Sequence, residues 1–371
     1  MPVMQEPEGE PFYVCLRVCL QRSRRGNGQF ISFGRVFLRR MQCFKLWRVR
    51  SLMKTLLRIG TRGSKLALWQ ANWVKHAIEA QHSHLSVEIR IIKTKGDKIL
   101  DVPLAKIGGK GLFVKEIEEA LLDGAIDIAV HSMKDMPGDI PAGLCIGAVP
   151  ERENPFDVLI SGRGLCLKDL KSGARIGTSS LRRSAQLFHV RPDLNIVPLR
   201  GNLDTRLKKL EGHDLDGIIL AAAGVRRLGL EDRITEYLAE DLMLPAAGQG
   251  ALCIEIRVND AVTTAAVAGL DHSPTRRVVL GERAFLHRLQ GGCQVPIAAF
   301  ARIIDSHLQI DGLVGTVDGK QLVKHHLEGP LEKAEILGTE LAEILLGKGA
   351  KEILEEIYRK SVPMVGSPYP Y

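Results

Sequence analysis

One short stretch of the chain, residues 126–137, constrains the fold most. It begins as an apolar run at 126–130, and an amphipathic segment at 115–122 precedes it. This order is typical of a helix that leads into a buried strand. The apolar pattern stops at His131, and Pro137 ends any further strand pairing. We therefore expect this strand to lie inside an α/β sheet.

The polar residues after this strand form a candidate site, because ligands of open α/β sheets bind beyond the carboxyl ends of the strands. Asp135 is the one acid expected at the site, and Lys134 lies beside it. The alternative interpretation is a solvated turn with a surface ion pair. This stretch alone favours neither interpretation over the other.

Length and charge set limits on the organisation. The chain has 371 residues, which predicts two or three domains, and its 45% hydrophobic and 25% charged residues are typical of a soluble protein. Residues 1–52 carry ten Lys or Arg and three Glu, a net charge of +7, so the rest of the chain holds 8 − 7 = +1. A general affinity of that part for nucleic acid is not expected, because such binding needs a broad basic surface.

The seven cysteines are widely scattered, with no CxxC pair and no Cys/His spacing typical of zinc. Their number and scatter indicate a reducing compartment, so we expect a cytoplasmic protein without a metal site.

The two ends of the chain differ from the rest. Residues 1–52 show no clean period, and a regular pattern begins at Met53. We favour a misassigned start, so that Met53 is the true beginning; an organellar transit peptide is the alternative. Glu6, Glu8 and Glu10 weaken that alternative, because transit peptides are poor in acids. The Pro-rich tail, residues 361–371, is expected to be disordered.

Arginines follow three successive predicted strands, at 174–177, 195–199 and 217–222. After the first of these strands, hydroxyl residues are predicted to cap a helix, and such a helix start is a ready anion site. Arg182 and Arg183 in its first turn oppose the helix dipole, a conflict typical of functional sites. The alternative is that both arginines point to solvent.

The arginines, the hydroxyls and a single aspartate indicate an anionic ligand, and a polycarboxylate suits them better than a phosphate because no nucleotide motif is present. The Gly-rich residues 108–111 are interpreted as a flexible lid rather than a phosphate loop. Cys293 follows two glycines, so its thiol could act covalently. Taken alone, a single cysteine is more often a small buried hydrophobe.

At this point the chain closely resembles the porphobilinogen deaminase (hydroxymethylbilane synthase) family, in its bacterial form. The resemblance covers residues 56 to about 358 in unbroken order. The matching motifs are Gly60-Thr61-Arg62-Gly63-Ser64-Lys65-Leu66-Ala67, Thr94-Lys95-Gly96-Asp97, Gly109-Lys110-Gly111-Leu112-Phe113, His131-Ser132-Met133-Lys134-Asp135-Met136-Pro137, Gly177-Thr178-Ser179-Ser180-Leu181-Arg182-Arg183, Leu199-Arg200-Gly201-Asn202, Gly248-Gln249-Gly250-Ala251 and Gln290-Gly291-Gly292-Cys293-Gln294-Val295-Pro296.

The resemblance implies a transferase of tetrapyrrole biosynthesis, the route to haem, chlorophyll and corrins. Such an enzyme condenses four porphobilinogen molecules head to tail into hydroxymethylbilane and releases ammonia. It also implies a dipyrromethane cofactor, attached to Cys293 by a thioether. We expect a monomer without a nucleic-acid partner, and without a membrane partner because no apolar run approaches the ~20 residues of a membrane span.

The resemblance further assigns roles to individual residues, with Asp135 as the catalytic acid and no metal ligand. Arg206 matches binding residues of both the cofactor and the substrate. The other cofactor residues implied are Cys293, Lys134, Thr178, Ser180, Arg182 and Arg183. The other substrate residues implied are Arg62, Ser64, Gln70, Phe113, Arg200, Arg227 and Gln249.

The implied architecture is three α/β domains. The first two resemble the lobes of type II periplasmic binding proteins, and the third is a small α/β sandwich. The domains expected are 53–151 with 247–268, 152–246, and 273–360. A non-catalytic anion-binding protein with the same two lobes is the main rival, but it leaves Cys293 without a role. A second rival is an RNA-associated protein that acts through residues 1–52.

Overall fold

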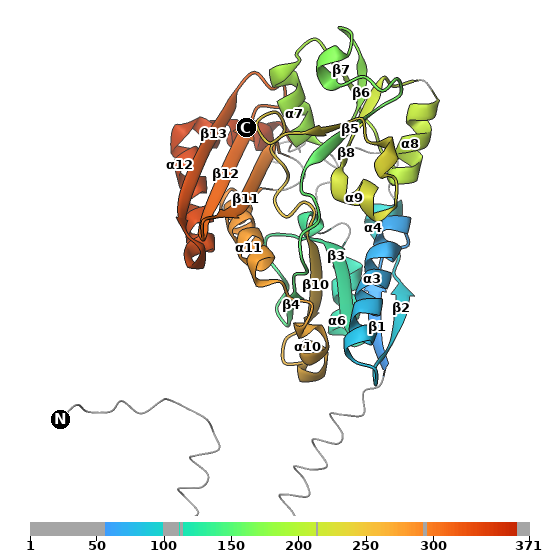
Figure 1. Cartoon of the computed structure of the whole chain (residues 1–371). Coiled ribbons are helices and arrows are strands. Elements are labelled where there is room, and N and C mark those ends of the chain that lie inside the picture. Colours follow the sequence, from blue (N-terminus) through green and yellow to red (C-terminus); the bar gives the residue numbers. More distant parts are fainter. Residues whose placement is uncertain (1–55, 99–110, 112–113, 213, 292–294, 362–371) are drawn as a thin grey trace, which may run out of the picture. The chain divides into compact units, whose positions relative to one another are not determined.

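A computed structural model describes residues 56–98, 111, 114–212, 214–291 and 295–361. The expectations for residues 1–52 and for the tail beyond residue 361 lie outside these residues, and so does most of the proposed lid. The described chain is mixed α/β, with two five-stranded sheets and one three-stranded sheet (Figure 1).

The first sheet has the strand order β2-β1-β3-β10-β4. Strands β1, β2 and β3 run parallel, whereas β10 pairs antiparallel with both β3 and β4. Its strands are β1 (Leu56–Thr61), β2 (Ser86–Ile91), β3 (Ile128–Ser132), β4 (Leu144–Ala148) and β10 (Leu252–Arg257). Its helices are α3 (Lys65–Gln81), α4 (Lys95–Lys98), α6 (Lys115–Leu122) and α10 (Ala261–Ala268).

Strand β3 is the buried strand predicted from the apolar run. Ile128 and Val130 pack in one core with α3 and α10, whereas Ala129 packs in a second core with α6. Both faces of the strand are therefore covered, which explains why its sequence is continuously apolar rather than alternating.

The second sheet repeats the plan, with the order β7-β6-β8-β5-β9. Strands β6, β7 and β8 are parallel, and β5 is antiparallel to its neighbours β8 and β9. The strands are β5 (Asp157–Ser161), β6 (Arg175–Gly177), β7 (Asn195–Val197), β8 (Gly217–Ala221) and β9 (Glu236–Leu238). The helices are α7 (Leu181–Val190), α8 (Leu203–Glu211) and α9 (Ala222–Arg227).

Two segments connect the lobes, where a lobe is one of these sheets with its helices. The first crossing is residues 149–156, between β4 and β5, and the second is residues 244–251, which leads into β10. The first crossing thus leads into β5, the one antiparallel strand of the second sheet. The second crossing leads into β10, the one antiparallel strand of the first sheet. Each lobe therefore depends on a strand that arrives from the other lobe.

The third part is an antiparallel sheet of β11 (Ile297–Ile304), β12 (His307–Gly315) and β13 (Leu322–Pro330). Helices α11 (Ser273–Arg288) and α12 (Ala334–Leu345) pack on this sheet (Figure 1). Helix α13 (Lys351–Ser361) follows after a kink at Gly349. On the sheet's other face, Phe300 packs against Phe156 of the first crossing, with ring centroids 5.6 Å apart.

One buried carboxylate ties this third part to both crossings. Glu282 of α11 is fully buried and binds Arg152 of the first crossing through two hydrogen bonds, of 2.7 and 3.1 Å. It also accepts hydrogen bonds from the backbone N–H groups of Gly248 (2.6 Å) and Ala301 (2.8 Å). A bidentate Arg–carboxylate pair fixes orientation as well as distance, so Glu282 orients the third part on the crossings.

Three details differ from what the local sequence predicts. The apolar spacing of residues 65–80 predicts that Trp69 and Trp73 lie on the buried side of their helix. They are 37% and 40% exposed, because α3 buries the face formed by Gln70, Ala71, Val74 and Ile78. Cys145, within a predicted strand, is expected to be buried and is half-buried. The pattern of residues 332–346 predicts a last helix there, but the chain turns and continues as α13.

No helix in the described part of the chain is long and apolar enough to cross a membrane.

The contact between the crossings generates a prediction about Gly250. Its φ is +89°, and an added Cβ would lie 2.3 Å from the carbonyl oxygen of Glu153 in the first crossing. Gly164 has a similar φ of +69°, but nothing lies within 4 Å of its added Cβ. In Gly164→Ala the only penalty is that alanine must adopt a left-handed conformation, which should lower the free energy of unfolding by about 1–2 kcal/mol. Gly250→Ala should lower the free energy of unfolding clearly more, because its Cβ also meets the Glu153 carbonyl.

Urea-induced unfolding, followed by tryptophan fluorescence, measures both variants. Equal losses of stability in the two variants would contradict the tight contact between the crossings.

Candidate functional site

A pocket lies where β3 ends, beside the start of α3. Its walls come from the loop after β1, from α3, and from the end of β3 with the turn that follows it. The lining residues are Arg62, Ser64, Leu66, Ala67, Gln70, Val114, Val130, His131, Ser132 and Asp135. The polar stretch singled out from the sequence is thus part of a pocket wall.

The turn that carries Lys134 and Asp135 is held from both sides. It is a single 3₁₀ turn, Met133–Asp135, directly after β3. Met133 and Met136 are buried in the core shared with α11, and the Met133 N–H donates to the carbonyl of Ala251 at 3.0 Å. Asp135 itself is exposed and faces the pocket. The two apolar anchors therefore leave a rigid turn that presents an acid to a ligand.

Gln70 and Ser64 support this pocket from α3. The Gln70 side chain is 3% exposed and donates to the Ser132 hydroxyl at 3.1 Å. Ser64 is the N-cap of α3 and accepts from the Ala67 N–H at 3.2 Å. Both predicted substrate residues thus line the pocket, and both also have a structural role.

Lys134 points toward the crossings rather than into solvent. Its ammonium group donates to the side-chain oxygen of Gln249 at 3.3 Å. Burial, with a further contribution from Arg183, lowers the pKa of Lys134 to about 8. Lys134 is therefore still mainly charged at neutral pH, and an anion bound beside it would stabilise the charged form.

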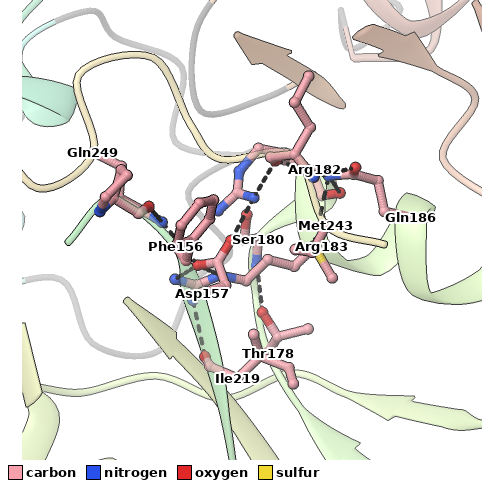
Figure 2. A network of polar contacts seen from close by, with 12 residues as sticks. Phe156, Asp157, Thr178, Ser180, Arg182, Arg183, Gln186, Ile219, Met243 and Gln249 are labelled. Atoms are coloured by element: carbon pink, nitrogen blue, oxygen red, sulfur yellow. Dashed lines mark hydrogen bonds and ion pairs between the residues drawn. The ribbon is translucent and has the colours of Figure 1, made fainter. Parts of the chain in front are cut away.

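Asp157 is the centre of the polar network in Figure 2. Its carboxylate accepts from Arg182 at 2.7 Å and from Arg183 at 2.9 and 2.7 Å. Gln249 donates to the same carboxylate at 3.0 Å, so the network reaches Lys134 as well. Arg182 and Arg183 are 5% and 6% exposed, so the alternative in which both point to solvent is wrong.

The electrostatics of Asp157 follow from its partners. Burial alone would raise the pKa of its carboxyl group, but the charges of Arg182 and Arg183 outweigh burial and hold the pKa well below its usual range. The conflict between these arginines and the dipole of α7 is thus offset by a buried acid from β5. With Lys134, the network holds three cations and one anion, so it retains an excess of positive charge.

Two further arginines extend this positive region. Arg206 of α8 is bound to the Gly201 carbonyl at 2.9 Å. Burial, followed by the charge of Arg183, lowers the pKa of Arg206 to about 10, while Asp135 opposes and Arg200 adds to the effect. These contributions place Arg206 within electrostatic reach of Arg183, Arg200 and Asp135.

Arg227 lies at the second crossing. Its guanidinium donates to the Gly250 carbonyl at 2.7 Å and lies over the Trp69 ring, 5.9 Å from the centroid. Burial lowers its pKa to about 10. In this arrangement Arg227 joins α9 of the second lobe to α3 of the first, and the pocket lining described above does not include it.

Thr178 and Ser180 lie between the end of β6 and the start of α7. Thr178 is 4% exposed, and its hydroxyl accepts from the Ser180 N–H at 3.2 Å. Ser180 is the N-cap of α7 but makes no side-chain capping bond. Its hydroxyl is therefore not used by the helix and can serve a ligand.

The sequence interpretation missed Asp157, Arg152 and Glu282. The signal for Asp157 is present, since two arginines that a helix start cannot tolerate need a carboxylate, and an acid directly precedes the apolar run 158–160. Glu282 has no such local signal, because its partner Arg152 lies 130 residues away along the chain. Cys293 and Phe113 lie outside the described residues.

The whole arrangement suits an anion with several carboxylates. Arginine binds carboxylates through paired hydrogen bonds, and the region carries more cations than anions. Within the described residues, no cluster of three or more His, Cys, Asp or Glu side chains could hold a metal ion.

Comparison with known protein families finds two matches along the chain. The model described as "Porphobilinogen deaminase, dipyromethane cofactor binding domain" matches residues 57–265. The model described as "Porphobilinogen deaminase, C-terminal domain" matches residues 277–347. Together they cover both lobes and most of the third part.

Curated relatives carry the same name. A porphobilinogen deaminase of Syntrophotalea carbinolica is 56% identical over 314 residues, which is 85% of this chain and 100% of the relative. One of Carboxydothermus hydrogenoformans is 55% identical over 307 residues, 83% of this chain and 99% of the relative. Among solved structures, a substrate binding domain of a putative molybdenum ABC transporter from Clostridium difficile has a TM-score of 0.39 and 10% identity, over 61% of this chain and 96% of that one, a similarity too low to bear on the ligand.

The Asp157 network generates a prediction. Asp157→Asn keeps the shape but leaves two buried guanidinium groups beside Lys134 without a counter-charge, so the free energy of unfolding at pH 7 should fall by about 3–5 kcal/mol. Because its folded pKa is depressed, the wild-type advantage is present above the ordinary pKa of a carboxyl group and is lost only as the pH falls below it. Urea unfolding at several pH values measures this.

The matched control is Asp193→Asn, which removes an exposed ion pair with Arg191 (2.8 Å) in the same lobe and should change stability little. Added sulfate should restore Asp157→Asn more than the wild type, since the released arginines can bind it. A stable Asp157→Asn protein without a response to sulfate would contradict the network.

Proposed function

We infer the mechanism of this chain from the fact that it belongs to the porphobilinogen deaminase family. The protein is a transferase of tetrapyrrole biosynthesis: it condenses porphobilinogen units into hydroxymethylbilane with release of ammonia, using a dipyrromethane cofactor. What we propose is which side chains perform each part of this reaction. The observation that carries the proposal is the rigid turn that presents Asp135 beside an excess of buried cations.

The residues around Asp157 fit the cofactor. A dipyrromethane carries acetate and propionate side chains, and the network of Lys134, Arg182 and Arg183 holds three cations against one carboxylate. We propose that these residues, with Thr178, Ser180 and Arg206, bind its carboxylates, and that Cys293 holds it covalently. When bound, the cofactor supplies the pyrrole carbon to which substrate units are joined.

We propose that Arg62, Ser64, Gln70 and Arg200 bind the incoming porphobilinogen, with Phe113, Arg227 and Gln249 contributing to the same site. Support comes from the pocket, since Arg62, Ser64 and Gln70 line it together with Asp135. Arginine at the pocket edge orients a carboxylate through paired hydrogen bonds. Orientation places the aminomethyl group of the substrate near the acid. Such positioning is the main way in which a binding residue increases the reaction rate.

Asp135 is proposed to act on the charge that develops. Loss of ammonia from porphobilinogen leaves a cation on the pyrrole, and joining the next ring leaves a positively charged ring that must lose a proton. A carboxylate beside both can stabilise the positive charge and carry the proton from one step to the next. The buried anchors Met133 and Met136 keep this carboxylate in place while the chain of pyrroles grows.

We also propose that the enzyme works as a cytoplasmic monomer without a nucleic-acid partner. Support comes from the sequence: cysteines without disulfide spacing and a net charge of only +1 beyond residue 52. A mass by light scattering above that of one chain, or binding of RNA by residues 53–371, would contradict this.

The role of Asp135 is tested by Asp135→Asn. An amide can neither carry the charge nor the proton, so porphobilinogen consumption should fall by about 100-fold or more, while the fold and the cofactor content stay intact. The control is Asp139→Asn, an exposed aspartate four residues later that contacts His287 at 2.8 Å. It should retain near wild-type turnover. Normal turnover in Asp135→Asn would overturn the assignment.

Attachment of the cofactor is tested by intact mass. A thioether survives denaturation, so the wild-type protein should exceed its sequence mass by two pyrrole units, and substrate should add further single units. Cys293→Ala should lose the excess and the ladder, whereas Cys166→Ala, which changes a half-buried thiol in the second lobe, should keep both. An unmodified mass in active wild-type protein rules out covalent attachment.

A further inference from the structure

A group of buried ionisable side chains lies behind the pocket and has no part in the mechanism above. His131 of β3 and Glu255 of β10 lie on the same face of the first sheet, because the register pairs His131 with Cys253 and Ala129 with Glu255. The His131 Nε2 atom is 3.2 Å from Glu255 Oε2, with the two side chains 4% and 0% exposed. Helix α6 covers this face and contributes Glu118, which is 7% exposed.

This group is unusual because its charges are poorly satisfied. Within the described residues, the Glu255 oxygens, Glu118 Oε1 and His131 Nε2 are buried and make no hydrogen bond of good geometry. Native proteins pair nearly all such atoms, and each exception needs an explanation, of which a catalytic role is one. For Glu118, burial disfavours the charged carboxylate, and the nearby carboxylate of Glu255 adds to that cost.

Its position connects it to the catalytic turn. His131 lines the same pocket as Asp135, and the chain runs from His131 through Ser132 directly into the turn Met133–Asp135. On the far side of the turn, Arg283 of α11 donates to the carbonyls of Pro137 (2.8 Å) and Gly138 (3.1 Å). The turn is therefore held between His131 at its start and Arg283 at its end.

Resting on the proposed role of Asp135, we propose that Glu118, His131 and Glu255 form a buried proton-holding cluster whose charge acts on the cation formed beside Asp135. His131 and Glu255 are positioning residues, and Glu118 is the member that gains or loses the proton. Loss of that proton places one more negative charge behind the pocket in which a cation forms. In a dry environment such a charge stabilises the cation and favours the reaction.

The surrounding charges agree with this assignment. Burial, and then the charge of Glu255, raise the pKa of Glu118 to about 7, while His131 opposes this. Burial and Glu255 likewise raise the pKa of Cys253 to about 12 and raise the pKa of Cys145. The other titratable and charged groups around the cluster are Cys145 from β4, Cys253 from β10, and Arg276 and Arg283 from α11. Glu119, on the exposed side of α6, adds only the smallest of the effects on Glu118.

The test uses Glu118→Gln, which has the shape of the protonated acid and cannot ionise, in the cofactor-loaded enzyme. A single group with a pKa of about 7 is about 10% ionised at pH 6 and about three quarters ionised at pH 7.5. The wild-type kcat should therefore rise up to about eightfold over this window, with KM little changed. Glu118→Gln should show a flat kcat at the lower level, and Glu118→Asp should keep a rise. Glu119→Gln, an exposed neighbour, should behave like the wild type.

A second measurement reports the same proton without catalysis. The folded pKa of Glu118 lies above the ordinary value of 4.5, so the folded protein binds more protons than the unfolded chain between about pH 4.5 and 7. The urea midpoint of the wild type should therefore fall as the pH rises through this window, and that of Glu118→Gln should fall less. A folded Glu118→Gln enzyme with the wild-type rise in kcat would overturn the proposal, even where Asp135→Asn is inactive; an active Asp135→Asn would instead overturn the role of Asp135 itself.

Discussion

The rest of the site depends on the ion pairs and hydrogen bonds of the buried Asp157 carboxylate. It is fully buried, yet it is bound by two arginines from α7 and by Gln249 of the second crossing. A charge in such a place is tolerated only when hydrogen bonds and counter-charges surround it. These bonds hold together the start of β5, the start of α7 and the second crossing. Gln249 also accepts a hydrogen bond from Lys134 and so links them to the first lobe.

The crossings carry a second constraint of the same kind. Glu282 binds Arg152 of the first crossing and the backbone N–H of Gly248 in the second, so it links α11 to both crossings. The second crossing also leads directly into β10, which pairs with β3, the strand before the Asp135 turn. The acid, the buried cations and the third part are thus all linked to the two connections between the lobes.

Charge is distributed unevenly over this framework. The second lobe contributes buried cations at the ends of its parallel strands, whereas the first lobe contributes Asp135 and, behind it, the carboxylates of Glu118 and Glu255. Most of the buried cations proposed to bind carboxylates thus come from the second lobe, and the proposed acid comes from the first. Arg62 lines the same pocket as Asp135, so the first lobe holds both a cation for a substrate carboxylate and an acid for the developing positive charge.

Much of this protein was predictable from local patterns. The apolar run before His131 predicted a buried strand, and the ordered motifs identified the family. The anion site indicated by the arginines after three strands stays a prediction. Such features depend on neighbours within a few residues, where period and residue type are sufficient. What only the tertiary structure decided involves partners far apart in sequence: Asp157 beneath Arg182 and Arg183, Glu282 across the crossings, Arg227 bound to Gly250, and Glu255 beside His131. Topology brings these groups together, and burial then decides which charges are satisfied. Among these partners only Asp157 has a partial local signal, because an acid directly precedes the apolar run 158–160.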